Sequence, residues 1–172
     1  MSIDTSQKQT PVSGDLHKAP FKGCLGSKAA TLALYTANYP VLPPAINSGG
    51  VLSVPDLITL NGNHWRKILT IFAKLTSPDD DWKTYRDHCL LQEREVICFA
   101  DSLCESASFH LIAGKASWEY LGVNLLEFQA LDVEQRLWVK GNVMCTPYFD
   151  YRQFPNALVD VARARIFEKL SV

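Results

Sequence analysis

Short apolar runs alternate with segments of helical periodicity along the 172 residues of this chain. Read in order, the pattern predicts a strand, a long loop, consecutive helices, a strand, a short helix, further strands and a closing helix. Strands that alternate with helices favour a parallel or mixed sheet with helices packed against it. We therefore expect an α/β fold, a three-layer sandwich in which a central parallel or mixed sheet of about four strands carries helices on both faces.

The first predicted strand precedes a long loop and a helix. Residues 31–39 are rich in β-branched, aliphatic and aromatic side chains, which favours a buried strand. Prolines and glycines interrupt residues 41–63, so we expect a long loop there. Apolar residues then recur at helical spacing in NHWRKILTIFAKL, which predicts an amphipathic helix with Asn63 as its N-cap.

The next segment, from SPDDDW onward, predicts further helices. Ser77 is the expected N-cap, and the acidic triplet that follows complements the positive end of the helix dipole without any need for a metal. The apolar stripe continues to Leu103, which is long for one globular helix. We therefore expect a break near residues 87–91 and two consecutive helices.

The second half of the chain alternates shorter elements. Residues 109–121 predict a buried strand, a glycine turn and a brief helix. A weak strand is expected within residues 125–131, and a hairpin is expected around Gly141-Asn142, which separates two strand-like runs. Apolar residues between Leu158 and Leu170 form one face of a closing helix.

Composition is that of an ordinary globular protein, with 47% apolar and 20% charged residues. Residues 1–20 are polar and predict a flexible N-terminal tail, whereas residues 21–172 are expected to form a single α/β domain. No secretion signal and no membrane-spanning stretch is evident in the sequence, so we expect a cytoplasmic protein. The formal charge of −1 excludes a globally basic nucleic-acid-binding protein but leaves a local basic patch open.

Cysteine and histidine positions predict neither a metal site nor a cofactor. The five cysteines form no CxxC pair, and reduced, mostly buried thiols are expected. His64, His88, Cys89 and His110 lack the spacings of common metal-binding motifs.

Ligands of open α/β sheets bind at the carboxyl ends of the strands. The loops expected at that edge follow the first strand, the strand that ends at Ala113, and the hairpin. We therefore expect a ligand site there, formed by Asn38, Lys115, Tyr148, Phe149, Tyr151 and Arg152, with Asn38 and Asp150 as catalytic candidates.

The last of these loops, TPYFDYRQFPNAL, combines aromatic and charged residues. Exposed rings can stack on a nucleobase while Arg152 contacts a phosphate. In the alternative interpretation, Tyr148 and Phe154 pack against the core, and Asp150 pairs with Arg152 or caps the turn. The sequence leaves both interpretations open.

Four motifs, taken in order, resemble the uracil-DNA glycosylase superfamily, in particular its mismatch-specific branch. LALYTANYP resembles the catalytic loop of that family, and NGNHWRKIL resembles its Asn-x-x-Trp helix start. HLIAGKASWEYLG resembles its strand that ends in Gly-Lys, and TPYFDYRQFPNALV resembles the loop before its last helix. The resemblance covers residues 31–170.

Two departures from the family pattern concern the catalytic groups. Tyr39 separates Asn38 from Pro40, which adjoin in the family, and Thr146-Pro147-Tyr148 stands where the family has Pro-Ser or His-Pro-Ser. The serine and histidine that would steady the leaving base are therefore missing.

The sequence leaves three functions open, and the resemblance with its altered loops motivates the first. The first is a glycosylase-like fold that binds a nucleobase, another small molecule, nucleic acid or a partner protein without catalysis. The second is an active base-excising glycosylase, in which Asn38 or Asp150 orients water and Tyr148 or Phe149 stacks on the base. The third is a structural or interaction module whose aromatic loop is buried or joins two copies in a homodimer.

Overall fold

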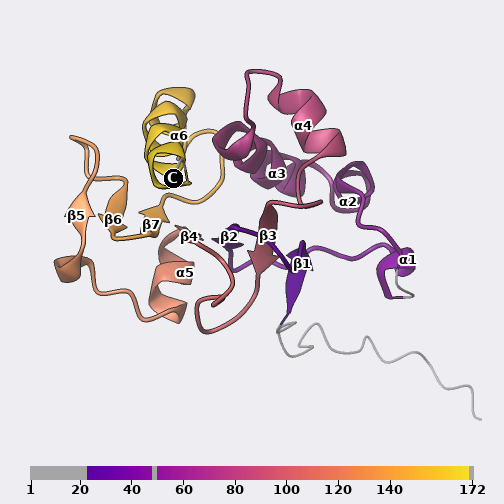
Figure 1. Cartoon of the computed structure of the whole chain (residues 1–172), viewed down its shortest axis with the longest axis horizontal. Coiled ribbons are helices and arrows are strands. Elements are labelled where there is room, and N and C mark those ends of the chain that lie inside the picture. Colours follow the sequence, from indigo (N-terminus) through magenta and orange to yellow (C-terminus); the bar gives the residue numbers. More distant parts are fainter. Residues whose placement is uncertain (1–22, 48–49, 171–172) are drawn as a thin grey trace, which may run out of the picture.

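The computed structural model describes residues 23–47 and 50–170 (Figure 1), so the predicted tail at residues 1–20 lies outside the described residues. The described chain forms a mixed α/β fold around a seven-stranded sheet in the order β1-β3-β2-β4-β7-β6-β5. The α/β class and the mixed sheet are thus confirmed, whereas about four strands was too few. The strands are β1 (Cys24–Gly26), β2 (Leu32–Tyr35), β3 (Glu95–Cys98), β4 (Phe109–Ala113), β5 (Gln129–Ala130), β6 (Trp138–Lys140) and β7 (Val143–Thr146).

The centre of the sheet is parallel and its edges are antiparallel. Strands β3, β2, β4 and β7 run parallel to one another, while β1 pairs with β3, and β6 with β7 and β5, in the antiparallel sense. Every residue of β2, β3 and β4 is buried, as expected for strands covered on both faces. The edge strand β1, which the sequence did not predict, has three residues, too few to show an alternation in sequence.

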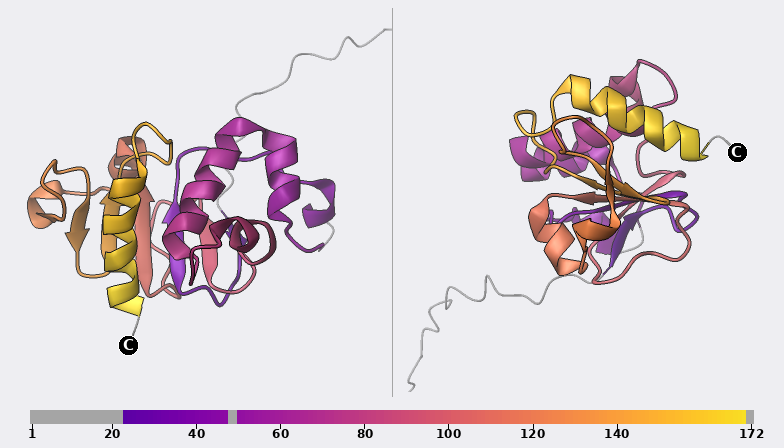
Figure 2. Two further views of the ribbon diagram at one scale, coloured as in Figure 1. Left: turned by 90° about the horizontal axis from the view of Figure 1, so that it is seen from above. Right: turned by 90° about the vertical axis from the view of Figure 1, so that its left-hand side faces the viewer.

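Helices lie on both sides of this sheet. Figure 2 shows α3, α4 and α6 on one side and α5 on the other. The larger apolar core lies beneath α2, α3 and α6, and a smaller one lies between the sheet and α5. Among the described residues, no helix has the length and apolar character needed to cross a membrane. The helices are α1 (Pro44–Asn47), α2 (Val54–Asn61), α3 (Asn63–Thr76), α4 (Trp82–His88), α5 (Lys115–Tyr120) and α6 (Asn156–Leu170), with a 3-10 turn at Leu125–Glu127.

Two of the predicted segments have a different structure. The helix expected to continue to Leu103 is wrong, because Glu95–Cys98 forms β3 beside β2. The apolar residues of Glu95–Cys98 fit the spacing of a helix. A segment of only four residues, however, fits equally well to a strand that is buried on both faces. The predicted loop at residues 41–63 contains α1 and α2, the latter capped by Ser53, whose hydroxyl accepts from the Asp56 N–H at 3.3 Å.

Helix starts also differ in detail, whereas the hairpin is confirmed. Gly62 is the N-cap of α3, and Asn63 is its first residue. Asp81 caps α4 by accepting from the Thr84 N–H at 3.2 Å, whereas Ser77 bonds within the preceding turn. The turn at Gly141 joins β6 and β7 as predicted. The weak strand expected within residues 125–131 is a 3-10 turn followed by the two-residue strand β5.

A buried carboxyl group anchors the start of β3 beneath α4. The Glu95 side chain is fully buried, where the Tyr85 hydroxyl donates to Oε1 and the Leu91 N–H donates to Oε2 at 3.2 Å. Burial raises the pKa of the Glu95 carboxyl above its ordinary value, although both hydrogen bonds act in the opposite direction. The folded protein therefore favours the protonated carboxylic acid more than the unfolded chain does.

The raised pKa of Glu95 predicts a pH-dependent loss of stability that Glu95→Gln removes. As pH rises from the unfolded value of 4.5 through the folded pKa, the buried carboxylate becomes charged and the native state is destabilised. The advantage of the wild type over Glu95→Gln should shrink across this range, by about 1.4 kcal/mol for each unit by which folding raises the pKa. Urea unfolding of both proteins at a series of pH values measures this difference.

A matched control is Glu119→Gln, which neutralises an exposed glutamate on α5. Because this side chain is exposed, the variant measures the effect of removing one negative charge away from the buried carboxyl group. A stability difference between the wild type and Glu95→Gln that does not change with pH would show that the Glu95 carboxyl does not govern the pH dependence.

Candidate functional site

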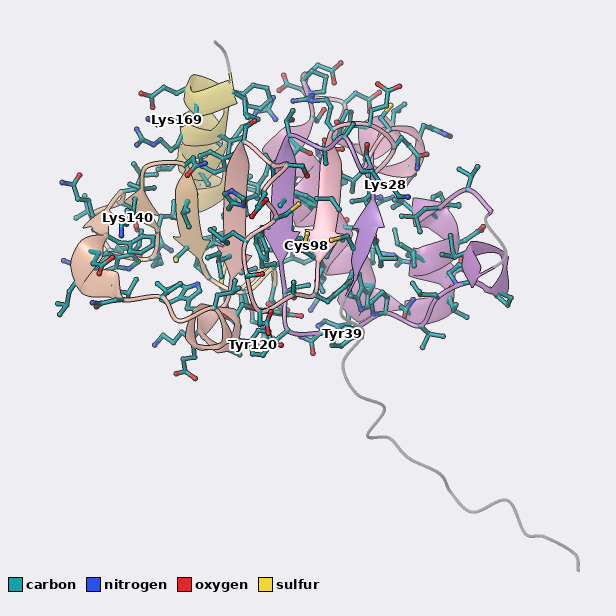
Figure 3. All side chains as sticks on the ribbon, turned by 60° about the horizontal axis from the view of Figure 1, so that its bottom comes forward. Lys28, Tyr39, Cys98, Tyr120, Lys140 and Lys169 are labelled. Atoms are coloured by element: carbon teal, nitrogen blue, oxygen red, sulfur yellow. The ribbon has the colours of Figure 1, made fainter. Side chains whose placement is uncertain are left out.

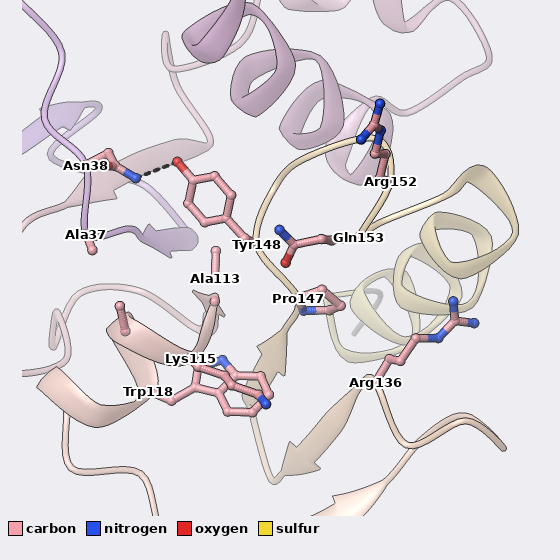
Figure 4. A pocket seen from close by; sticks show the side chains of 12 residues that line it. Ala37, Asn38, Ala113, Lys115, Trp118, Arg136, Pro147, Tyr148, Arg152 and Gln153 are labelled. Atoms are coloured by element: carbon pink, nitrogen blue, oxygen red, sulfur yellow. Dashed lines mark hydrogen bonds between the residues drawn. The ribbon is translucent and has the colours of Figure 1, made fainter.

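A cavity of about 720 Å³ opens where the loops after β2, β4 and β7 meet (Figure 4). We call it the edge pocket. Its lining residues lie within residues 37–38, 113–118 and 147–153, together with Arg136 from the segment before β6. Parallel strands end at the same edge of a sheet, so residues distant in sequence meet here. The volume is within the usual range for small-molecule sites.

Tyr148 connects three elements at one wall of the edge pocket. Asn38 Nδ2 donates to the Tyr148 hydroxyl oxygen at 2.6 Å, as Figure 4 shows, and His64 Nε2 lies 2.6 Å from the same oxygen. His64 belongs to the first turn of α3, so this hydroxyl joins the loop after β2 to that helix. Burial raises the pKa of Tyr148 above its ordinary value, which keeps the phenol protonated.

Gly114 allows the loops after β4 and β7 to approach closely. Its φ of +83° lies in the left-handed region, and an added Cβ would stand 3.1 Å from Tyr148 Cδ2. A side chain at this position would therefore strain the backbone and press on the Tyr148 ring. Gly114 therefore allows the Tyr148 ring to lie close to the start of α5.

Three cationic side chains and no carboxylate line the edge pocket: Lys115, Arg136 and Arg152. Arg136 forms ion pairs with Asp132 at 3.4 Å and Glu134 at 3.1 Å. Within residues 23–47 and 50–170, neither Lys115 nor Arg152 forms an ion pair. Lys115 and Arg152 therefore bring positive charge to the pocket that no ion pair among the described residues offsets.

Trp118, like Tyr148, adds an aromatic ring to the lining of the edge pocket. The Trp118 indole N–H donates to the Ile112 carbonyl at 2.9 Å, which holds the ring against the end of β4. Pro147 and three alanines add apolar surface, and the amide of Gln153 lies on the side opposite Trp118 in Figure 4. The arrangement can hold a planar group beside an anionic one.

Asp150, one of the two catalytic candidates, does not line the edge pocket. Its carboxylate lies 2.9 Å from Lys67 Nζ and also accepts from the Arg152 backbone N–H at 3.0 Å. The hydrogen bond from Lys67 is the main reason that the pKa of Asp150 lies below its ordinary value. Asp150 thus caps the turn, as one interpretation predicted, but its ionic partner is Lys67, and only the backbone of Arg152 bonds to it.

The aromatic residues of the final loop divide between the core and the surface. Phe149 and Phe154 are both buried, with their rings edge to face at 5.5 Å between centroids. Tyr151 is 45% exposed, and its ring lies near the ammonium groups of Lys67 and Lys74 at 5.8 and 5.9 Å. Neither Phe149 nor Tyr151 lines the edge pocket, so the structure brings together Asn38, Lys115, Tyr148 and Arg152 from the predicted set.

Sequence reasoning did not name His64, Trp118, Arg136 or Gln153 as site residues, although it placed the loop that contains Gln153 at this edge. Trp118 carried a signal, since it belongs to the brief helix that follows Gly114. Arg136 carried none, because its position depends on the path of the segment between α5 and β6. In the described part of the chain, no group of three or more His, Cys, Asp or Glu side chains could hold a metal ion.

Comparison with known proteins identifies the family of this chain. No curated protein shows a significant match, and neither does any solved structure. A sequence profile described as "Family of unknown function (DUF6942)" matches residues 23–166, and this match spans most of the chain. The chain therefore belongs to the DUF6942 family, a family of unknown function.

Proposed function

We propose that the protein binds an anionic small molecule that carries a planar ring, such as a nucleoside phosphate, in the edge pocket. The observation that carries this proposal is the set of three cationic side chains around a cavity with no carboxylate in its lining. The whole chain has a formal charge of −1, so this concentration of positive charge is local. The proposed role is binding, without catalysis.

The charged part of the ligand would lie near Lys115 and Arg152. Because these two side chains form no ion pair among the described residues, they have hydrogen-bond donors available for phosphate oxygens. Arg136 already has two acidic partners, so it would contribute less. A phosphate group matches this donor set better than a neutral group does.

The planar part of the ligand would lie against Trp118. The indole is oriented by its hydrogen bond to Ile112, so little side-chain entropy is lost when a ring stacks on it. The amides of Asn38 and Gln153 line the same cavity and can donate to and accept from the edge of a base. These two contacts would select among planar ligands.

The resemblance to the uracil-DNA glycosylase superfamily supports the same proposal. It suggests a three-layer fold of that type whose base-binding edge has lost its catalytic groups. The convergence of Asn38, Lys115 and Tyr148 on one cavity is consistent with a pocket in the position that the resemblance implies.

Neutralising Arg152 or Lys115 should weaken the binding of a nucleoside phosphate. Loss of one charge-assisted hydrogen bond costs about 1.5 kcal/mol or more, so Arg152→Gln and Lys115→Gln should each raise the Kd about tenfold. Isothermal titration calorimetry with the common nucleoside monophosphates, their nucleosides and inorganic phosphate measures the effect. Binding of the monophosphate should also weaken as salt concentration rises.

Lys169→Gln is the control for this experiment because it removes one exposed cation from the end of α6. Figure 3 shows Lys169 on α6 at the top of the view, whereas Tyr39, which follows β2, lies at the bottom. This variant should bind like the wild type. Equal affinities for Lys169→Gln, Arg152→Gln and Lys115→Gln, or no binding of any probe to the wild type, would contradict the proposal.

Replacing Trp118 should separate the planar contact from the ionic one. Trp118→Leu keeps an apolar side chain but removes the stacking surface, which contributes about 1 to 3 kcal/mol per base. The Kd for the monophosphate should rise about tenfold, while the Kd for inorganic phosphate should change little. If the affinities for the monophosphate and for inorganic phosphate fell equally, Trp118 would instead be needed for the stability of the fold. Circular dichroism would then show a loss of folded structure in the variant.

A second candidate function is base excision, favoured by the position of the Asn38 amide in the wall of the edge pocket beside Tyr148. Asp150, the other group proposed to orient water, does not line this cavity. We therefore expect no base release from uracil-containing or mismatched oligonucleotides at neutral pH and low salt. If the wild type released bases from these oligonucleotides and Asn38→Ala did not, base excision would replace binding as the proposed function.

A further inference from the structure

Two cysteines face each other across the antiparallel pair of β1 and β3. Cys24 and Cys98 are direct partners in the register, and their sulfur atoms lie 3.1 Å apart as free thiols. Cys24 is an exposed residue at the edge of the sheet, whereas Cys98 is 1% exposed. Figure 3 shows Cys98 on the strands, away from the helices α3 and α6.

The backbone hydrogen bonds define the type of pair. The Phe99 N–H donates to the Gly23 carbonyl at 3.0 Å, and the Ser27 N–H donates to the Glu95 carbonyl at 3.1 Å. Hydrogen-bonded pairs alternate with non-hydrogen-bonded pairs along an antiparallel ladder, so Cys24 and Cys98 form a non-hydrogen-bonded pair. Such pairs have Cα atoms about 4.5 Å apart, which a disulfide can span without a shift of the backbone.

A third cysteine, Cys104, lies near the buried member of the pair. It is next to Ser106, with 3.1 Å between Sγ and Oγ. The hydrogen bond with Ser106 is the main reason that the pKa of the Cys104 thiol lies below its ordinary value, and the neighbouring Cys98 acts in the same direction. Burial raises the pKa of Cys98, so this thiol needs a nearby acceptor for its proton when it reacts. The Cys104 sulfur is such an acceptor.

From this geometry we propose that Cys24 and Cys98 form an oxidation site, at which a hydroperoxide converts the two thiols into a disulfide that joins β1 to β3. The exposed Cys24 thiolate attacks the peroxide O–O bond, giving a sulfenic acid and releasing the other oxygen as hydroxide, or as alkoxide from an organic peroxide. The Cys98 sulfur then attacks the sulfenic sulfur, Cys104 takes up the Cys98 proton and passes it to the departing sulfenic oxygen, and water leaves. In total two thiols lose two hydrogen atoms, and hydrogen peroxide becomes two molecules of water.

The test treats the full-length protein with hydrogen peroxide, blocks the remaining thiols and maps the linked peptides by mass spectrometry. Trypsin releases Cys24 within residues 23–28 but leaves Cys98 and Cys104 together within residues 95–115, so chymotryptic cleavage after Phe99 is needed to separate them. We expect a link between the Cys24 and Cys98 peptides that dithiothreitol reverses. Cys24→Ser and Cys98→Ser should each abolish it.

Cys89 and Cys145 provide the controls, because the first is exposed and the second is buried. Cys89→Ser and Cys145→Ser should form the link as readily as the wild type. Cys24→Ser changes an exposed position, so it remains informative even if Cys98→Ser fails to fold. The proposal is overturned by a link between Cys104 and either partner, by disulfides found only between chains, or by irreversible oxidation of Cys24 without a link.

Discussion

The parallel pairing of β2, β4 and β7 is the constraint on which the candidate site depends. Tyr35 is opposite Ile112, Ile112 is opposite Cys145, and Ala113 is opposite Thr146, so the three strands end at nearly the same level. The chain must leave each strand at one edge, and its next residues surround a common cavity. Gly114 then allows Tyr148 to lie against the turn after β4.

The final loop directs its acidic and basic side chains to different places, and this determines the charge of the edge pocket. Asp150 is directed to Lys67 of α3 and to the backbone of its own turn, and this leaves the lining of the edge pocket without a carboxylate. Phe149 packs beneath the same turn between Phe72 and Phe154 and holds it to the core. A turn held on both sides places Tyr148 and Arg152 at the wall of the edge pocket.

Long periodic patterns predicted elements well, and short ones did not. The α3 segment repeats its apolar spacing over three turns, and the hairpin at Gly141 has a recognisable turn, so both were predicted correctly. The segment Glu95–Cys98 is too short to show a periodic pattern. It is a strand because it pairs with β2, which lies far earlier in the chain. The helix α2, which Ser53 caps, was also missed, because the prolines and glycines of this segment predicted only a loop.

By itself, the sequence determined the α/β class and the edge at which loops gather, because alternating patterns and right-handed parallel connections restrict the topology. It also identified four of the residues that line the edge pocket. Only the tertiary structure decided that Asp150 faces Lys67, that His64 reaches Tyr148 and that Cys24 faces Cys98. Those contacts join residues 74 or more positions apart, and the direction of a side chain across such a distance depends on packing, which local sequence patterns do not encode.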